Sequence, residues 1–515
     1  MEIPMWHFKP TDGYFGDPIP FFFEGVFHVF YLKAPTEPKR RGADFTTYEH
    51  IATRDFVNWT EYPTVIAPDE AGPDRTSCWT GSVFHHDGVF HLFYTGYNNS
   101  YVINGRNPQR DPNPQSICLA TSRDMVRWSK HPGNPISLPP AGRFDFEHWR
   151  DPFVFRNPAK GCFMMSITAM VRNEGFFTAG ALVMARSKDL AQWEVGEVYY
   201  NPGNHCFPEC SDLFRMGDQW YLVTSVFDKT CYRMAPSLNG PWTTGRTDSF
   251  DGPLNYAMKT MGDDKRRVVL GWIRTKAGRR DNGGWEWAGL MSFPREIQRD
   301  NDGTLFVRLP AELNAVRGDE VFNLTAGKGS GRVTLGHTIG GEGKGIRFAP
   351  GQLYGEYALD SFHPEFDAEF EFMPDARTRS ASLLIMAEAK AREADAPDHP
   401  GYQVAVNWHQ RTLSVHKHGR RCGAYVFQDI DIETGTPACL RIIMERGLIE
   451  AFLNDKFALA CPVYHTAPQT RLAFIVEEGG GLLSSLKIWK LAPAPAVKKA
   501  GADTFTPAPA MAGAV

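Results

Sequence analysis

A short pattern that recurs along the first half of the chain constrains its fold more than any other feature. The pattern begins with Ala, passes through an Asp and ends with Trp, and it occupies residues 52–59 (ATRDFVNW), 120–128 (ATSRDMVRW) and 185–193 (ARSKDLAQW). A weaker fourth copy covers residues 235–242. Because such recurrence is the signature of a repeat architecture, we expect one structural unit to be built several times.

Turn signals between apolar segments indicate that the unit consists of paired β-strands. Residues 23–31 (FEGVFHVFY), 86–94 (HDGVFHLFY) and 216–222 (MGDQWYL) each combine a Gly-containing turn with alternating apolar residues, which is typical of a β-hairpin. Each repeat is therefore expected to be a four-stranded antiparallel sheet, the unit of a β-propeller blade. With a last unit over residues 256–296, the sequence predicts an all-β fold that begins with a five-bladed β-propeller.

The repeated Trp and Asp side chains have structural explanations. We expect each Trp to pack in the core of its blade, and each Asp to fix a turn by accepting hydrogen bonds from backbone N–H groups. These residues are Trp59, Trp128 and Trp193, with Asp55, Asp124 and Asp189.

Three acidic residues stand at similar places in three of the units. Asp17 and Asp151 each precede Pro and an apolar run, and Glu209 follows Pro in a related segment. Pro is tolerated at the first position of a strand, so we expect the acids to open the innermost strands and to converge at one end of the propeller channel. Trp79 holds the equivalent position in the second unit. Convergent carboxylates beside an aromatic ring fit the cleavage of a glycosidic bond.

The composition argues against several other classes of function. The 55 Lys and Arg against 59 Asp and Glu give a formal net charge of −4, which favours neither nucleic acid nor a membrane surface as partner. Nine Cys without a Cys-x-x-Cys pair or a Cys/His cluster indicate reduced thiols and no metal site. There is no apolar run of about 20 residues and no signal-peptide pattern. We therefore expect a cytoplasmic protein that acts on a small molecule without a cofactor.

The second half of the chain predicts a separate β-sandwich. Residues 366–372 (FDAEFEF) and 402–408 (YQVAVNW) alternate without a helical period, as strands of a sandwich do. Its sheet surface is compatible with a homodimer, which no sequence feature requires. The Ala/Pro-rich end of the chain is expected to be disordered. The predicted units are a propeller over 1–308, a linker over 309–328, a sandwich over 329–491 and a tail over 492–515.

In order and spacing, these segments resemble glycoside hydrolase family 32, the β-fructofuranosidases, over nearly the whole chain. Each match is short, but together they are specific. The matching segments are 17–18 (DP, nucleophile motif), 150–152 (RDP), 209–210 (EC, acid/base motif), 79–82 (WTGS), 292–296 (SFPRE), 309–313 (LPAEL) and 441–454 (RIIMERGLIEAFLN, sandwich signature).

The resemblance implies a retaining, two-step hydrolysis of terminal fructofuranosyl linkages. Asp17 would attack the anomeric C2 while Glu209 protonates the leaving oxygen and later activates water. This requires Asp17 to be ionised and Glu209 protonated at rest, so their pKa values are expected to be pushed apart. Asp151, kept ionised by Arg150, would hold the furanose hydroxyls. The catalytic residues implied are Asp17, Asp151 and Glu209, and the substrate-binding residues are Trp79, Arg150, Asp251 and Tyr256.

The polar lining departs from the pattern of the family. Residues 14–20 read YFGDPIP where the family has Trp-Met-Asn-Asp-Pro-Asn-Gly, and residues 30–35 read FYLKAP where Phe-Tyr-Gln-Tyr-Asn-Pro is common. Two amides that would contact the sugar are thereby lost. We therefore do not assume sucrose or inulin as substrate, and we expect a small intracellular fructo-oligosaccharide or a difructose anhydride.

Three other functions remain open at the level of sequence. A fructosyltransferase would use the same residues with a sugar acceptor in place of water. An inverting arabinofuranosidase or xylosidase of a related five-bladed family would hold its two carboxyl groups about 6.5–9.5 Å apart, against about 5–5.5 Å for a retaining enzyme. A carbohydrate-binding propeller without turnover would not need the acid set.

Overall fold

A computed structural model of the chain describes residues 4–501 apart from short gaps. The two helical elements of the described residues are 3-10 turns, η2 (Ala277–Arg279) and η3 (Ala311–Val316). In this described part, no helix has the length and apolar character needed to cross a bilayer. The gaps are residues 37–44, 100–113, 141, 158–159, 172–178, 204–205, 264, 281–282, 336–337, 341–344, 388–400, 419–422 and 465–469.

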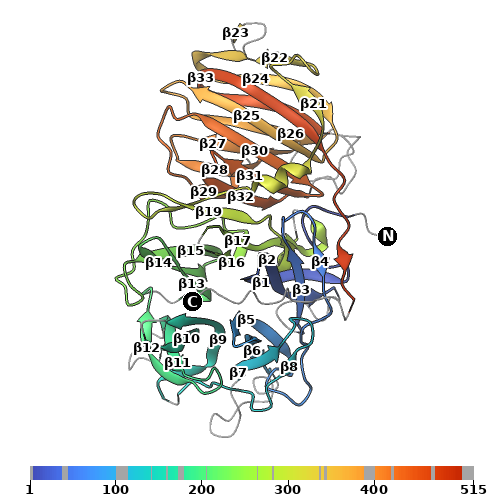
Figure 1. Cartoon of the computed structure of the whole chain (residues 1–515). Helices are drawn as coiled ribbons and strands as arrows, with labels where there is room; N and C mark the ends of the chain where they lie inside the picture. Colours follow the sequence, from blue (N-terminus) through green and yellow to red (C-terminus); the bar gives the residue numbers. More distant parts are fainter. Residues whose placement is uncertain are drawn as a thin grey trace.

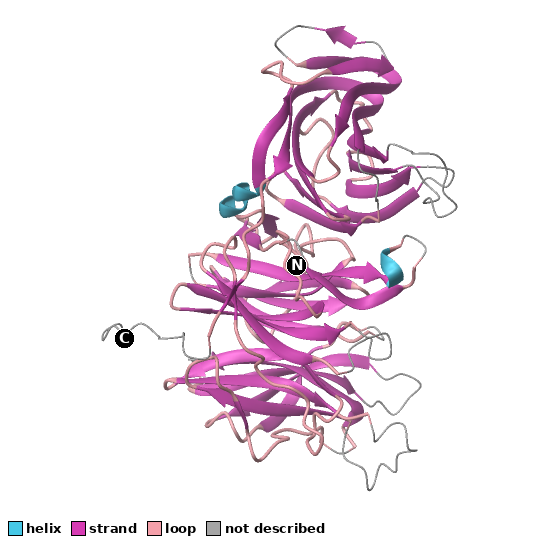
Figure 2. Ribbon diagram, turned by 90° about the vertical axis from the view of Figure 1, so that its right-hand side faces the viewer, coloured by secondary structure: helices cyan, strands magenta, loops and turns pink. Residues whose placement is uncertain are grey.

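The described strands form two stacked halves (Figure 1). The blue to green strands of the first half lie below the orange and red strands of the second, and a view turned by 90° shows the same division (Figure 2). The chain is a five-bladed β-propeller followed by a β-sandwich, which confirms the predicted fold class.

The first three blades match the predicted unit. In the described residues each has four antiparallel strands that follow one another in chain order. The first hairpin turns of blades 1 and 2 end with Gly25 (φ 73°) and Gly88 (φ 72°), a conformation that Gly adopts without strain. The strands are β1 (Gly13–Phe23), β2 (Val26–Pro35), β3 (Thr47–Thr53) and β4 (Thr60–Glu61); β5 (Ser77–His86), β6 (Val89–Tyr97), β7 (Gln115–Ser122) and β8 (Ser129–Lys130); and β9 (Phe144–Asn157), β10 (Cys162–Val171), β11 (Ala179–Ser187) and β12 (Glu194–Tyr200).

Blades 4 and 5 depart from the regular unit. Blade 4 has three strands, and isolated bridges from Cys231 to Ser249 and from Met234 to Thr243 stand in for the fourth. In blade 5, strand β18 also pairs with β1 of blade 1 opposite Phe15, which closes the ring. The strands are β13 (Glu209–Met216), β14 (Gln219–Val226) and β15 (Lys229–Ala235) in blade 4, and β16 (Asn255–Gly262), β17 (Arg267–Lys276), β18 (Trp285–Met291), β19 (Arg295–Arg299) and β20 (Leu305–Arg308) in blade 5.

The repeated side chains behave as predicted. Asp55 Oδ1 accepts hydrogen bonds from the backbone N–H groups of Val57 (3.0 Å) and Asn58 (2.8 Å), and the Asp of the next two copies makes the same pair of bonds. Trp59 is buried in the core, and the Trp residues of the other copies pack against blade cores. Both structural predictions for the repeat are confirmed.

The sandwich is held together by one long strand, β33 (Thr470–Leu491). Its first half pairs with β26 (Ser380–Ala387) and its second half with β25 (Phe366–Pro374), so a single strand connects the two sets of sandwich strands. The remaining strands are β22 (Gly331–Leu335), β23 (Thr338–Gly340), β24 (Ile346–Phe362), β27 (Gly401–Asn407), β28 (Thr412–His418), β29 (Gly423–Asp429), β30 (Ala438–Glu445), β31 (Leu448–Leu453) and β32 (Phe457–Pro462).

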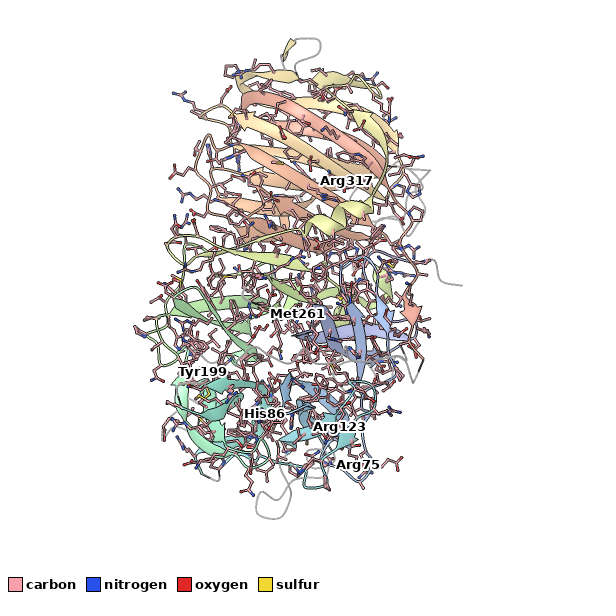
Figure 3. The ribbon with its side chains drawn as sticks, in the orientation of Figure 1. Arg75, His86, Arg123, Tyr199, Met261 and Arg317 are labelled. Atoms are coloured by element: carbon pink, nitrogen blue, oxygen red, sulfur yellow. The ribbon has the colours of Figure 1, made fainter. Side chains whose placement is uncertain are left out.

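Two of the predicted boundaries need correction. Part of the predicted linker forms β21 (Arg317–Asn323), which pairs with β33; Arg317 lies in the sandwich half (Figure 3) and forms an ion pair with Asp367. Part of the predicted disordered tail, residues 492–501, runs back along the propeller, where β34 (Lys498–Lys499) pairs in parallel with β4. The Ala/Pro-rich segment is ordered there because the propeller supplies partners for its backbone. Residues 502–515 lie outside the described residues.

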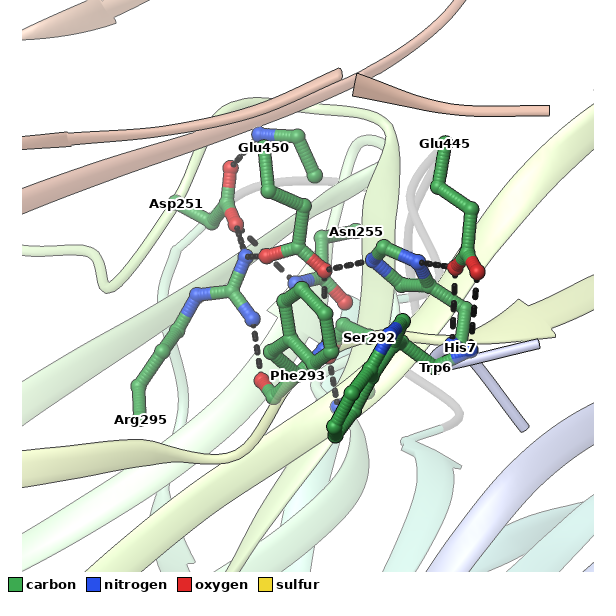
Figure 4. A network of polar contacts seen from close by, with 11 residues as sticks. Trp6, His7, Asp251, Asn255, Ser292, Phe293, Arg295, Glu445 and Glu450 are labelled. Carbon is green, nitrogen blue, oxygen red and sulfur yellow. Dashed lines mark hydrogen bonds and ion pairs between the residues drawn. The ribbon is translucent and has the colours of Figure 1, made fainter. Parts of the chain in front are cut away.

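A buried ionic network joins the N-terminal segment, blade 5 and the sandwich (Figure 4). His7 Nδ1 lies 2.7 Å from Glu445 Oε2, and His7 Nε2 lies 3.0 Å from Glu450 Oε1. Arg295 forms ion pairs with Glu450 (2.7 Å) and with Asp251. Both glutamates come from the β30–β31 hairpin, whose sequence resembles the sandwich signature. Removing one member would leave an unpaired buried charge, so the network couples the two halves energetically.

The protonation of His7 should make stability fall in alkaline solution. Burial lowers the pKa of His7, but hydrogen bonds and charge from Glu445 and Glu450 outweigh it and raise the pKa from 6.5 to about 9. The added stability is therefore complete below pH 6.5 and is lost as the pH rises through 9, a loss of about 3 kcal/mol. Thermal unfolding of the wild type and of His7→Gln between pH 6.5 and 9.5 checks this. The difference in melting temperature between the two proteins should shrink as the pH rises, and a constant difference would contradict the prediction.

Candidate active site

The innermost strands carry bulges at the mouth of the channel. In β1 the register shifts between Phe15 and Pro18, and in β9 it shifts around Asp151 and Pro152. The prediction that Asp17 and Asp151 open strands is therefore wrong, since both lie inside long strands; Glu209 does open β13. Each Pro is tolerated because the bulge interrupts the ladder where its N–H is missing, and bulges re-aim side chains. The same shift occurs in β5, β13 and β16.

The three predicted acids converge around Cys210. The backbone N–H of Cys210 donates a hydrogen bond to Asp151 Oδ2 (2.9 Å), and Cys210 Sγ lies 3.8 Å from Asp17 Oδ2. Glu209 is the neighbouring residue in the chain. Burial raises the pKa of the Cys210 thiol well above its usual value, and the charges of Asp17 and Asp151 raise it further, so the thiol is a neutral packing group and donor.

Glu209 is held by two donors. Arg150 Nη2 donates to Oε1 (2.9 Å), and the Tyr256 hydroxyl donates to Oε2 (2.7 Å). The side chain of Glu209 is 33% exposed, whereas those of Asp151 and Arg150 are buried. Glu209 is therefore the member of the acid set that solvent and a leaving group can reach.

Asp17 lies in a closed environment. Trp272 Nε1 donates to its Oδ1 (2.8 Å). Burial raises the pKa of Asp17 from 3.8 to about 7, the charge of Asp151 adds to the shift, and the Trp272 bond and the charge of Lys259 oppose it. Desolvation thus exceeds the stabilisation by the donors of Asp17 and works against its ionisation, so the ionised state of Asp17 at rest stays a prediction.

Arg150 pairs mainly with Glu209. Its Nε lies 3.8 Å from Asp151 Oδ2, whereas its Nη2 lies 2.9 Å from Glu209. Burial raises the pKa of Asp151, and Arg150 and the Cys210 N–H lower it without cancelling the shift. Arg150 is the strongest of the groups that lower the pKa of Asp151, in line with its predicted role, and its closer contact with Glu209 adds a second role, the orientation of that side chain.

The structure separates one predicted substrate-binding residue from the rest. Asp251 is fully buried in the ionic network, where its carboxylate pairs with Arg295 and accepts hydrogen bonds from Asn255 and Ala460. It has no free oxygen for a sugar, so its predicted contact with the substrate is wrong. Tyr256 does reach the acid set, through Glu209.

Trp79 lies on the bulged strand of blade 2. Its ring stacks on Tyr97 with centroids 4.0 Å apart, and the neighbouring Gly81 carbonyl accepts a hydrogen bond from Lys259 Nζ (2.7 Å). Because Lys259 acts electrostatically on Asp17 and Asp151, the bulge borders the acid set. Contact between the Trp79 ring and a sugar stays a prediction.

Two site residues escaped the sequence prediction. Trp272 and Lys259 both come from blade 5 and influence the acids of blades 1 and 3. Each stands in an apolar strand segment with no local signal of function. Their contacts with residues more than a hundred positions away arise only from ring closure.

One group among the described residues has the geometry to hold a metal. It consists of Asp145, Glu147 and His148, whose candidate ligand atoms lie within 4.8 Å of one another. His148 Nδ1 lies 3.1 Å from Arg150 Nη1, and this cation disfavours a second positive charge there. We assign no metal to the group.

The geometry fits acid/base and nucleophilic chemistry on one bond. A buried carboxyl group with a Trp donor stands beside a second buried carboxylate, and a more exposed carboxyl group lies next to a cation and a phenol. Two carboxyl groups in different environments are what glycosidic cleavage requires.

Comparisons with known proteins agree with this geometry. The profile of the glycosyl hydrolases family 32 N-terminal domain matches residues 7–310, more than half of the chain. A raffinose invertase and a sucrose-6-phosphate hydrolase, both of Escherichia coli, are each 24% identical and cover 95% of this chain, which covers 95% and 94% of them. A fructan 1-exohydrolase IIa from Cichorium intybus in complex with 1-kestose superposes with a TM-score of 0.69 at 19% identity over 96% of this chain and 98% of its own.

Proposed function

The chain belongs to glycoside hydrolase family 32, and from that membership we propose that it hydrolyses terminal β-D-fructofuranosyl linkages of small fructosides with retention of configuration. The observation that carries the proposal is the meeting of Asp17, Asp151 and Glu209 around Cys210. Membership makes the chain a glycoside hydrolase; the roles of the residues are our proposal.

In the first step, the Asp17 carboxylate attacks C2 of the fructofuranosyl unit as the bond from C2 to the glycosidic oxygen breaks. Glu209 gives its proton to that oxygen, and the leaving group departs as an alcohol. Trp272 holds one oxygen of Asp17, which leaves the other to form the ester. Asp151 accepts hydrogen bonds from furanose hydroxyls that strengthen as positive charge develops on the ring.

In the second step, the Glu209 carboxylate takes a proton from a water molecule, whose oxygen attacks C2. The bond between C2 and Asp17 breaks, and fructose leaves with its original configuration. Arg150 and Tyr256 donate to both oxygens of Glu209, an arrangement that suits the carboxylate present between the two steps.

We propose sucrose, raffinose and short fructo-oligosaccharides as the substrate class, with difructose anhydrides as a further member. Support comes from the names of the two relatives that match over nearly the whole chain, an invertase for raffinose and a hydrolase for sucrose 6-phosphate. The eight cysteines in the described part of the chain are free thiols, which supports our proposal of a reducing, cytoplasmic setting.

A substrate panel tests the function. Sucrose, raffinose, 1-kestose, inulin, levan and a difructose anhydride are incubated with the enzyme, and free fructose is measured by chromatography. Free fructose from the small fructosides is expected, and added methanol should yield methyl β-D-fructofuranoside, because a retaining ester intermediate can be intercepted by an alcohol. Release from pentosides alone, or binding without turnover, would overturn the proposal. Oligosaccharide growth in place of fructose release would identify a transferase.

A further inference from the structure

A contact between blades 4 and 5 lies at the rim of the acid site. Ser225, near the end of β14, pairs with Glu209, so the turn that follows β14 emerges on the same face as the acid set. The end of β17 reaches the same face, because Trp272 pairs with Tyr256. Asp228 in the turn and Arg274 on β17 form an ion pair of 2.7 Å across this junction.

Arg274 lies above the two rings that contact the reacting acids. Its guanidinium carbon is 5.4 Å from the centroid of the Tyr256 ring and 5.9 Å from that of Trp272. Tyr256 donates to Glu209 and Trp272 donates to Asp17. A group bound by Arg274 would therefore sit beside the proton donor, where the leaving group must be.

Arg274 keeps donors available after it pairs with Asp228. A guanidinium has five N–H donors, and the ion pair with Asp228 involves Nη2. The Arg274 side chain is 21% exposed, so a ligand can reach donors that the ion pair does not use. Since Asp228 balances its charge, the site favours an uncharged hydroxylated group over an anion.

The turn that supplies Asp228 also presents an aromatic ring. Phe227 is 72% exposed, and both Phe227 (φ 51°) and Asp228 (φ 66°) adopt left-handed backbone conformations. The two residues form the whole turn between β14 and β15, a position where positive φ angles favour Gly or Asn. Left-handed conformations at two successive residues, one of them a bulky Phe, store backbone strain, which is typical of a functional position.

We propose that Arg274 determines the leaving-group specificity of this enzyme by donating hydrogen bonds to hydroxyls of an uncharged sugar unit, with Asp228 as its positioning residue and the Phe227 ring packed against that sugar. The inference rests on the proposed fructoside hydrolysis. It assigns the departing sugar, such as the glucosyl unit of sucrose, to the junction of blades 4 and 5.

The test compares two substrates that share a fructosyl unit. Sucrose carries a sugar leaving group, and methyl β-D-fructofuranoside carries only a methyl group. In Arg274→Gln the ratio of kcat/KM for sucrose to that for the methyl fructoside should fall about ten- to hundredfold. Asp228→Asn should lower the same ratio by a smaller factor through a higher KM for sucrose. Arg233→Gln is the matched control, because Arg233 is similarly half-buried, pairs with Asp248 in blade 4 and lies outside the site.

Several outcomes would overturn the inference. Equal losses on both substrates would show that Arg274 acts on the chemistry or on folding, and an unchanged ratio would show that it does not touch the leaving group. A larger loss on sucrose 6-phosphate than on sucrose would show that Arg274 recognises an anion. Failure of the wild type on both substrates would instead refute the proposed function.

Discussion

Replacing Asp17 by Asn is expected to lower kcat on sucrose by about 10⁵-fold or more, because an amide cannot form the fructosyl ester. The Trp272 donor can still bond the amide oxygen, so the geometry of the pocket is preserved. Steady-state rates on sucrose, with mass spectrometry for a covalent fructosyl adduct, check the result. Asp17→Ala gives the residual rate without the nucleophile, because Ala, unlike Asn, cannot be converted to Asp by deamidation.

We expect Asp17→Asn to lose activity without unfolding, and stability measurements test this expectation. Folding raises the pKa of Asp17 from 3.8 to about 7, so the folded state binds more protons and loses stability as the pH rises across this range. Asn removes that penalty, and the variant should melt no lower than the wild type at pH 8. The same shift predicts that wild-type kcat/KM falls below pH about 7. Retained turnover in Asp17→Ala would reject Asp17 as the nucleophile.

The propeller could be predicted because its repeats carry local signals. The Asp of each copy caps its own turn within three residues, as Asp55 does with Val57 and Asn58. Apolar alternation and Gly-containing turns then identify the strands of each blade. Only short-range interactions are needed for these features, so a single sequence contains them.

The details of the acid site depend on contacts between blades and could not be predicted from local sequence signals. The bulges at Asp17 and Asp151 have the same Asp-Pro signal as the start of a strand, and the two cases differ only in pairing with the next strand. Arg150 adjoins Asp151 in sequence, yet the bulge turns it toward Glu209. Asp251 matched a motif by spacing, but its oxygens are taken by Arg295 and Asn255 of blade 5 and by the backbone of Ala460 in the sandwich.

The strands of the sandwich were predictable, but its ends were not. Residues 317–323 alternate too weakly to be recognised as β21, and the tail is ordered by hydrogen bonds that the propeller provides. In both cases a partner distant in sequence creates the order, and composition alone does not reveal that partner.

Glu209→Gln is expected to lower kcat/KM on sucrose by about 10³- to 10⁴-fold, because the leaving oxygen loses its proton donor. The loss should depend on the leaving group. A β-D-fructofuranosyl fluoride needs no proton to release fluoride, so its first step should proceed in the variant, and the ester on Asp17 should accumulate because no base activates water. Azide needs no base, and it should attack C2 of that ester, release Asp17 and give β-D-fructofuranosyl azide.

The contrast between the two variants assigns the two roles. Asp17→Asn should remain inactive on the fluoride with or without azide, whereas azide should restore turnover in Glu209→Gln. Rescue of Asp17→Asn by azide with retained configuration, through an ester that still forms in this variant, would assign the roles the other way round. Equal loss on sucrose and the fluoride in Glu209→Gln would show that the side chain orients Arg150 and Tyr256 and does not transfer the proton. Because Glu209 is the partly exposed acid between Arg150 and Tyr256, we expect the rate to depend on the leaving group in Glu209→Gln.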